Sequence, residues 1–162
     1  MASIAAHPKF LVLGVGNTLL QDDGVGIHVA EALRQFAESD LDIVDGGTIG
    51  LALLPQLESA DAVIIVDAAD LGEAPGSLKV FLDREVDRHL SGQRRSVHEV
   101  AVLDLLAAAD IRGRRPRHCA LVAIQPRSTD WGLEPTPEVW QAIQPACESI
   151  AKLTQRWRHD PL

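Results

Sequence analysis

The 162-residue sequence predicts an α/β fold, in which a mostly parallel sheet is covered by helices on both faces. Short apolar runs that end in turn residues alternate with longer segments whose apolar residues recur at helical spacing. The segment between the third and fourth predicted strands is too short for a crossover helix, so these two strands are antiparallel or are not neighbours. The chain length fits one domain, 1–162.

The predicted strands and helices follow one another in a regular order. The strands are short apolar runs at 10–15, 41–44, 62–66, 78–82 and 118–124. The helices are segments with helical apolar spacing at 24–36, at 49–57, from 96 onward and at 137–157. Pro55 weakens the prediction for the second helix, because proline is disfavoured in a helix interior. Ser96 and Glu99 have the spacing of a capping box, which places His98 in the first turn of its helix.

The composition excludes several classes of protein. The formal net charge of −8 argues against a general nucleic-acid binder, which needs a basic face. Arginines cluster at 94–95 and at 112–117. These clusters are best explained as solvated loops, and the alternative is a patch that binds an acidic partner surface. No window approaches the roughly 18 unbroken apolar residues of a membrane span, and the N-terminus lacks the pattern of a secretory signal. We therefore expect a cytoplasmic protein, in which Cys119 and Cys147 are buried thiols rather than a disulfide.

The segment after the first strand is the first place to look for chemistry, because ligands of such sheets bind outside the carboxyl ends of the strands. Its sequence is GVGNTLLQDDGVG, in which Leu19 stands where a dinucleotide fingerprint needs its third glycine. Asp22 and Asp23 would also repel a phosphate at the start of the helix. Helix capping explains one of these aspartates, and a functional role is the alternative for the other.

Asp67 directly follows the β-branched run of the third strand, and His98 opens a later helix. Together with Asp23 they offer one imidazole and two carboxylates, a set that suits zinc or nickel better than magnesium. The spacing of these three residues is not a known metal-binding motif, so the expectation that their side chains come together in space rests on the predicted topology. Asp45, in the segment DGGT after the second strand, forms a turn or faces a substrate. We find neither a G-x-S-x-G elbow nor an H-E-x-x-H motif.

Taken together, six segments resemble the hydrogenase maturation endopeptidase family: FLVLGVGNTLLQDDGVG, VDGGTIGLALL, VIIVDAAD, APGSL, SVHEVAVLDLL and GLEPTPEV. The resemblance implies a three-layer α/β/α sandwich around a five-stranded, mostly parallel twisted sheet with one antiparallel strand. It also implies that Asp23, Asp67 and His98 bind metal, with glutamate in place of Asp23 in some members. Asp45 is a second candidate for substrate contact or cleavage.

The activity that this resemblance implies is removal of the C-terminal extension from the nickel-loaded precursor of a hydrogenase large subunit. The nickel would arrive with the substrate, so we expect weak or no metal binding in the isolated protein, which we take to be a monomer. The segment 125–132 suggests a cytoplasmic, NAD-linked bidirectional hydrogenase as the host. Two alternatives remain open at this point: a nickel-sensing chaperone that does not cut the precursor, and a metal-dependent hydrolase of small molecules.

Overall fold

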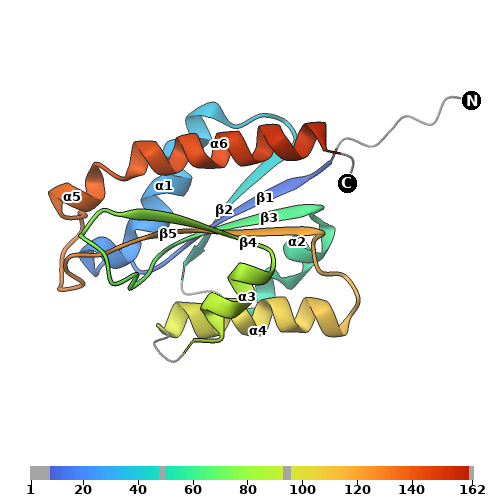
Figure 1. Cartoon of the computed structure of the whole chain (residues 1–162), viewed down its shortest axis with the longest axis horizontal. Coiled ribbons are helices and arrows are strands. Elements are labelled where there is room, and N and C mark those ends of the chain that lie inside the picture. Colours follow the sequence, from blue (N-terminus) through green and yellow to red (C-terminus); the bar gives the residue numbers. More distant parts are fainter. Residues whose placement is uncertain (1–7, 48–49, 93–95, 161–162) are drawn as a thin grey trace, which may run out of the picture.

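The computed structural model describes residues 8–47, 50–92 and 96–160, and its centre is a five-stranded sheet (Figure 1). The strands lie in the order β2-β1-β3-β5-β4. Their bounds are Phe10–Val15 for β1, Leu41–Gly47 for β2, Ala62–Ala68 for β3, Leu78–Leu82 for β4 and His118–Ile124 for β5. Only β4 is antiparallel, and it pairs with β5. The predicted mixed sheet is confirmed, and β3 and β4 are not neighbours.

Helices cover both faces of the sheet, with α1 and α6 on one face and α2, α3 and α4 on the other (Figure 1). Their bounds are Val25–Leu33 for α1, Leu54–Ser59 for α2, Arg84–Leu90 for α3, Val97–Ile111 for α4, Pro137–Trp140 for α5 and Ile143–His159 for α6. Short 3₁₀ turns lie at Gln21–Gly24, Arg34–Phe36 and Leu51–Leu53. Within the described part of the chain, no helix is long and apolar enough to cross a membrane.

Two prolines account for differences between the predicted and observed helices. The predicted helix at 137–157 is instead two helices, because Pro145 lies in the first turn of α6, where its missing N–H is not needed. Likewise Pro55 lies in the first turn of α2, so this helix begins later than predicted. The predicted start at residue 49 lies outside the described residues. The sequence pattern missed α3, a helix of seven residues with only two buried side chains.

The core consists of two apolar clusters on opposite faces of the sheet. Alternate residues of the central strands contribute to each cluster, as Phe10 and Leu11 of β1 show. Strands buried on both faces read as continuous apolar runs, which is why the sequence identified them readily. Both cysteines are free and buried, as expected, with Cys147 in the cluster under α1 and α6 and Cys119 in the cluster under α2, α3 and α4.

Glycines allow the start of α1 to lie directly against the ends of β1 and β3. A Cβ atom on Gly26 would lie 2.1 Å from the carbonyl oxygen of Val66, and one on Gly16 would lie 1.9 Å from the carbonyl oxygen of Asp23. Gly16 also has a φ of 135°, which other residues rarely adopt. These close approaches are made by the chain's own backbone, and they bring the turn that carries Asp23 next to the end of β3.

Candidate functional site

The predicted site residues gather at the carboxyl ends of the central parallel strands. Asp23 lies in the 3₁₀ turn between β1 and α1, Asp67 lies near the end of β3, and His98 lies in the first turn of α4. A pocket of about 370 Å³ opens there. It is lined by Asp23, Ala68, Ala69, Asp70, Ser96, Glu99, Pro126 and Thr129.

Asp23 and His98 are in direct contact. The Nε2 atom of His98 lies 2.9 Å from Oδ2 of Asp23, and the backbone N–H of Asn17 donates to the same oxygen at 3.0 Å. Both side chains are largely buried. Burial raises the pKa of Asp23, but the hydrogen bond and charge of His98, together with the Asn17 N–H, outweigh it and lower the pKa below its ordinary value. Asp23 is therefore an ionised carboxylate at neutral pH.

The capping box of α4 fixes the position of His98. The Ser96 hydroxyl accepts a hydrogen bond from the Glu99 N–H at 3.1 Å, and the Glu99 carboxylate accepts one from the Ser96 N–H at 2.8 Å. This confirms the predicted capping box. The second carboxylate oxygen of Glu99 lies 3.0 Å from Nε2 of His89 in α3. The start of α4 is thus joined to α3 as well as to its own first turn.

Asp67 is a buried acid without a partner. Its exposed fraction is 1%, and neither carboxylate oxygen has a hydrogen-bond partner among the described residues. Burial, followed by the negative charges of Asp23 and Glu99, raises the pKa of Asp67 well above its ordinary value, and the nearby backbone N–H of Ala68 offsets only part of this rise. A carboxyl group in such a place is stable when it binds a proton or a cation.

The three predicted metal-binding residues are therefore only partly assembled. Asp23 and His98 touch, and Asp67 is close enough for the charge of Asp23 to act on it. In the part of the chain that the structure describes, however, no three or more His, Cys, Asp or Glu side chains are arranged to hold a metal ion.

Asp45 lies apart from this pair, at the end of the edge strand β2. Its exposed carboxylate accepts a hydrogen bond from the Gly47 N–H at 2.8 Å, which is the turn interpretation of the DGGT segment. Its Cα is paired with Gly14 of β1, so it still lies at the same edge of the sheet as the pocket. A contact with a bound substrate therefore stays a prediction.

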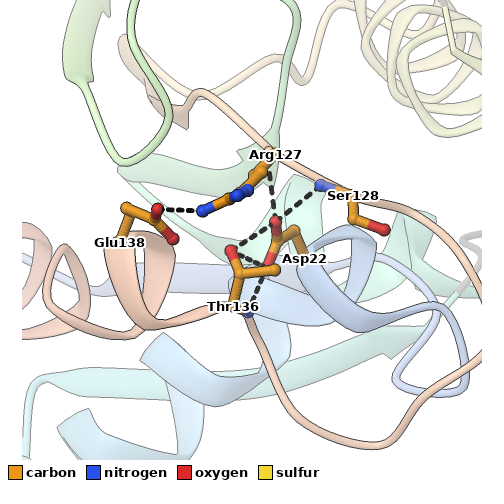
Figure 2. Close-up of polar contacts among 5 residues, drawn as sticks. All are labelled: Asp22, Arg127, Ser128, Thr136 and Glu138. Carbon is orange, nitrogen blue, oxygen red and sulfur yellow. Dashed lines mark hydrogen bonds and ion pairs between the residues drawn. The ribbon is translucent and has the colours of Figure 1, made fainter.

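Asp22 has a structural role that the sequence did not reveal. It is completely buried, and its carboxylate accepts hydrogen bonds from the N–H groups of Arg127, Ser128 and Thr136 at 2.8, 3.0 and 2.6 Å (Figure 2). The Thr136 hydroxyl donates as well, at 2.8 Å. Burial raises the pKa of Asp22, but these donors together lower it below its ordinary value.

Capping does not account for the carboxylate of Asp22, because no side chain caps the turn in which it lies. Asp22 instead holds the segment after β5. No pattern in the sequence could have shown this, because three of its four donors are backbone groups and they lie at least 105 positions away.

Comparison with known proteins identifies the family to which this chain belongs. The model of a family described as hydrogenase maturation protease matches residues 27–153. The hydrogenase expression/formation protein HupD of Bradyrhizobium diazoefficiens is 40% identical over 160 residues, which cover 97% of this chain and 83% of that protein. The chain belongs to the hydrogenase maturation protease family. The hydrogenase 2 maturation protease of Escherichia coli is 37% identical over 145 residues, 88% of each chain.

Solved structures of hydrogenase maturation proteases agree with this assignment. The hydrogenase maturating endopeptidase HybD from Escherichia coli matches with a TM-score of 0.85 and 36% identity, covering 91% of this chain and 93% of that one. The maturation protease HybD from Thermococcus kodakarensis matches with a TM-score of 0.76 and 26% identity, over 90% and 98% of the two chains. The predicted family and fold are confirmed, and this hydrogenase maturation protease is a peptidase.

Proposed function

We propose that this hydrogenase maturation protease removes the C-terminal extension of a nickel-loaded large-subunit precursor, and that Asp23, Asp67 and His98 recognise the nickel that the precursor carries. The observation that carries the proposal is the contact of His98 with Asp23, a residue that lines the pocket, close to the buried carboxyl group of Asp67. One imidazole and two carboxylates are donors that nickel accepts.

The arrangement of the donors supports a metal that arrives with the substrate. Asp23 and His98 now use Oδ2 and Nε2 to bind each other, and these same atoms would bind the metal. A nickel ion already held by ligands of the precursor needs only its open positions filled, for which one imidazole and one or two carboxylates suffice. We therefore expect the isolated protein to bind free metal weakly.

Asp67 has a distinct part in this proposal. A cation in the pocket would offset the unfavourable burial of its negative charge, so Asp67 would favour the nickel-loaded precursor over an empty one. Bound nickel would hold the scissile bond over the pocket and supply Lewis acidity there. Asp45, at the end of β2, is the second candidate for contact with the peptide that is cut.

The finer assignments remain proposals of the same kind. The segment 125–132 favours an NAD-linked bidirectional hydrogenase as the host, with the protease acting as a monomer in the cytoplasm. Incubation with precursors of different hydrogenases tests the first point, since only the cognate precursor should be shortened. Sedimentation of the isolated protein tests the second.

The test of the main proposal is mass spectrometry of a nickel-loaded large-subunit precursor after incubation with wild-type protein or with His98→Ala. We expect wild type to release a C-terminal peptide from nickel-loaded precursor only, and His98→Ala to release none. His159→Ala is the matched control, because this exposed histidine ends α6 at the far end of the sheet from the pocket, near the start of β1, where Trp157 stacks on Phe10. Full cleavage by His98→Ala would refute the proposed metal site.

A further inference from the structure

The segment 126–136, between β5 and α5, is held against the turn that carries Asp23. The Gln21 N–H donates to the Gly132 carbonyl at 2.9 Å, and the Gly132 N–H donates to the Leu19 carbonyl at 2.9 Å. The Asp22 N–H donates to the Ser128 carbonyl at 3.2 Å. The two contacts of Gly132 form a short parallel bridge between Leu20 and Gly132. We call residues 126–136 the docking segment.

The Asp22 carboxylate fixes this segment more firmly than the backbone contacts alone. A completely buried carboxylate is stable only while its hydrogen bonds are made, so movement of the docking segment would leave a charge buried without donors (Figure 2). An ion pair between Arg127 and Glu138 of α5 holds the segment from its other side. The docking segment is therefore anchored at Arg127, Ser128, Gly132 and Thr136, although it is a loop.

This anchored loop carries large apolar side chains that are exposed to solvent. Trp131 is 80% exposed and Leu133 is 69% exposed, and Leu19 across the bridge is 49% exposed. We call these three residues the apolar surface. The same segment lines the pocket through Pro126 and Thr129. Trp131 is two residues from Thr129, so their Cα atoms are within about 7 Å, which places Trp131 near the rim of the pocket.

We propose that the apolar surface is where the hydrogenase large-subunit precursor docks beside the pocket, and that Asp22 is the positioning residue that holds it in place. This inference rests on the proposed function, which requires a folded protein to place its C-terminal segment in the pocket. An exposed tryptophan with two leucines, on a preorganised segment next to the site, is the composition of a protein-binding hot spot. Apolar side chains at the rim match a polypeptide surface rather than a small polar ligand.

The first test is steady-state cleavage of nickel-loaded precursor by Trp131→Ala. We expect KM to rise about tenfold, the effect of removing a hot-spot side chain, while kcat stays within about twofold of wild type. Phe36→Ala is the matched control, because Phe36 is also an exposed aromatic residue (72%) but lies after α1, at the other end of the sheet. An unchanged KM in Trp131→Ala, or a fall in kcat alone, would overturn the docking role.

The second test asks whether Asp22 positions the apolar surface or only stabilises the fold. Asp22→Asn presents an amide to the donors of the docking segment, so we expect KM to rise as in Trp131→Ala. If both act through the apolar surface, the double variant should be no worse than the poorer single variant. Thr136→Val, which removes one donor and keeps the charge, should show a smaller rise and guards against misfolding of Asp22→Asn. Fully additive effects on KM would contradict the positioning role.

Direct binding distinguishes failure of this inference from failure of the proposed function. Immobilised full-length precursor is exposed to wild type, Trp131→Ala and Phe36→Ala, and the dissociation constant is measured without reference to cleavage. Weaker binding of Trp131→Ala alone would support the apolar surface even if no peptide were released. Equal binding of all three proteins would refute it even if cleavage occurred. A change in the sedimentation of the isolated protein on Trp131→Ala would instead assign the surface to contacts between copies.

Discussion

The imidazole of His98 lies within hydrogen-bonding distance of the Asp23 carboxylate, with Nε2 and Oδ2 2.9 Å apart, although 75 positions separate the two residues in the chain. Each partner is fixed by its own local structure. Asp23 is held by the turn that packs on Gly16, and His98 by the capping box of α4. The contact is therefore preorganised by two elements that the fold brings together at one edge of the sheet.

Replacement of Asp67 by asparagine should stabilise the protein at neutral pH. The pKa of Asp67 is raised in the folded state, so its contribution to stability is fully present below its unfolded pKa of about 3.9 and is lost as pH rises through the folded value. Between those two values the free energy of unfolding of wild type falls relative to Asp67→Asn by about 1.4 kcal/mol per pH unit. Urea unfolding from pH 4 to pH 8 measures this, and a pH-independent difference would contradict it.

Asp22→Asn should have the opposite dependence on pH. The folded pKa of Asp22 is lowered, so its stabilising contribution is present above about pH 3.9 and is lost as pH falls through the folded value. We expect the variant to lose about 3 kcal/mol of unfolding free energy at pH 7, because hydrogen bonds to a charged group are exchanged for weaker ones. The difference from wild type should shrink below pH 4. Asp45→Asn, at an exposed turn, is the control and should change stability little.

Loss of the capping box should weaken both α4 and the site. Ser96→Ala removes the hydroxyl that accepts from the Glu99 N–H, which should cost about 1 kcal/mol of stability. Because His98 lies in the turn that the box stabilises, cleavage of the precursor should also slow. Ser96→Thr keeps a hydroxyl and should retain most of both properties. Thermal unfolding and mass spectrometry on the same samples would check this, and equal behaviour of the two variants would count against it.

Gly26→Ala should destabilise the protein strongly and disturb the pocket. Its new Cβ would lie 2.1 Å from the Val66 carbonyl oxygen, so either α1 or the end of β3 must move. We expect a loss of about 3 kcal/mol, the upper part of the range for overpacking. Gly50→Ala is the control, because a Cβ there meets no atom within 4 Å. Chemical denaturation of both variants would test this prediction. Equal denaturation midpoints for Gly26→Ala and Gly50→Ala would argue against the close contact of Gly26 with the Val66 carbonyl.

The fold was largely predictable because the central strands are buried on both faces and read as unbroken apolar runs, as in 62–66. The family segments supplied the order of the layers, and the rule that ligands bind at the carboxyl ends of strands placed Asp23, Asp67 and His98 at one edge. The short helix α3 was missed because it buries only Val86 and Leu90, too few residues to form a periodic pattern.

The contacts of the aspartate pair were not predictable. Asp22 and Asp23 are adjacent and chemically identical, yet the first is buried among backbone donors and the second faces His98. Which of the two faces the pocket depends on the path of the docking segment, and that path is set by tertiary contacts rather than by local sequence. Likewise, the break before α6 depends on Pro145, which a periodic apolar pattern does not detect.

The two buried cysteines lie on opposite sides of the sheet, and this gives the molecule a natural pair of probes. Cys147 belongs to α6 and is buried in the core cluster on that side of the sheet, whereas Cys119 of β5 is packed beneath the layer that contains α4. Burial raises the pKa of Cys119 to about 12, so its thiol hardly reacts in the native state. The rate at which each thiol reacts with an alkylating reagent would thus measure how often its own helical layer detaches. Comparison of the two rates would show whether the layer that carries His98 opens more readily than the layer behind it, without introducing any label into the chain.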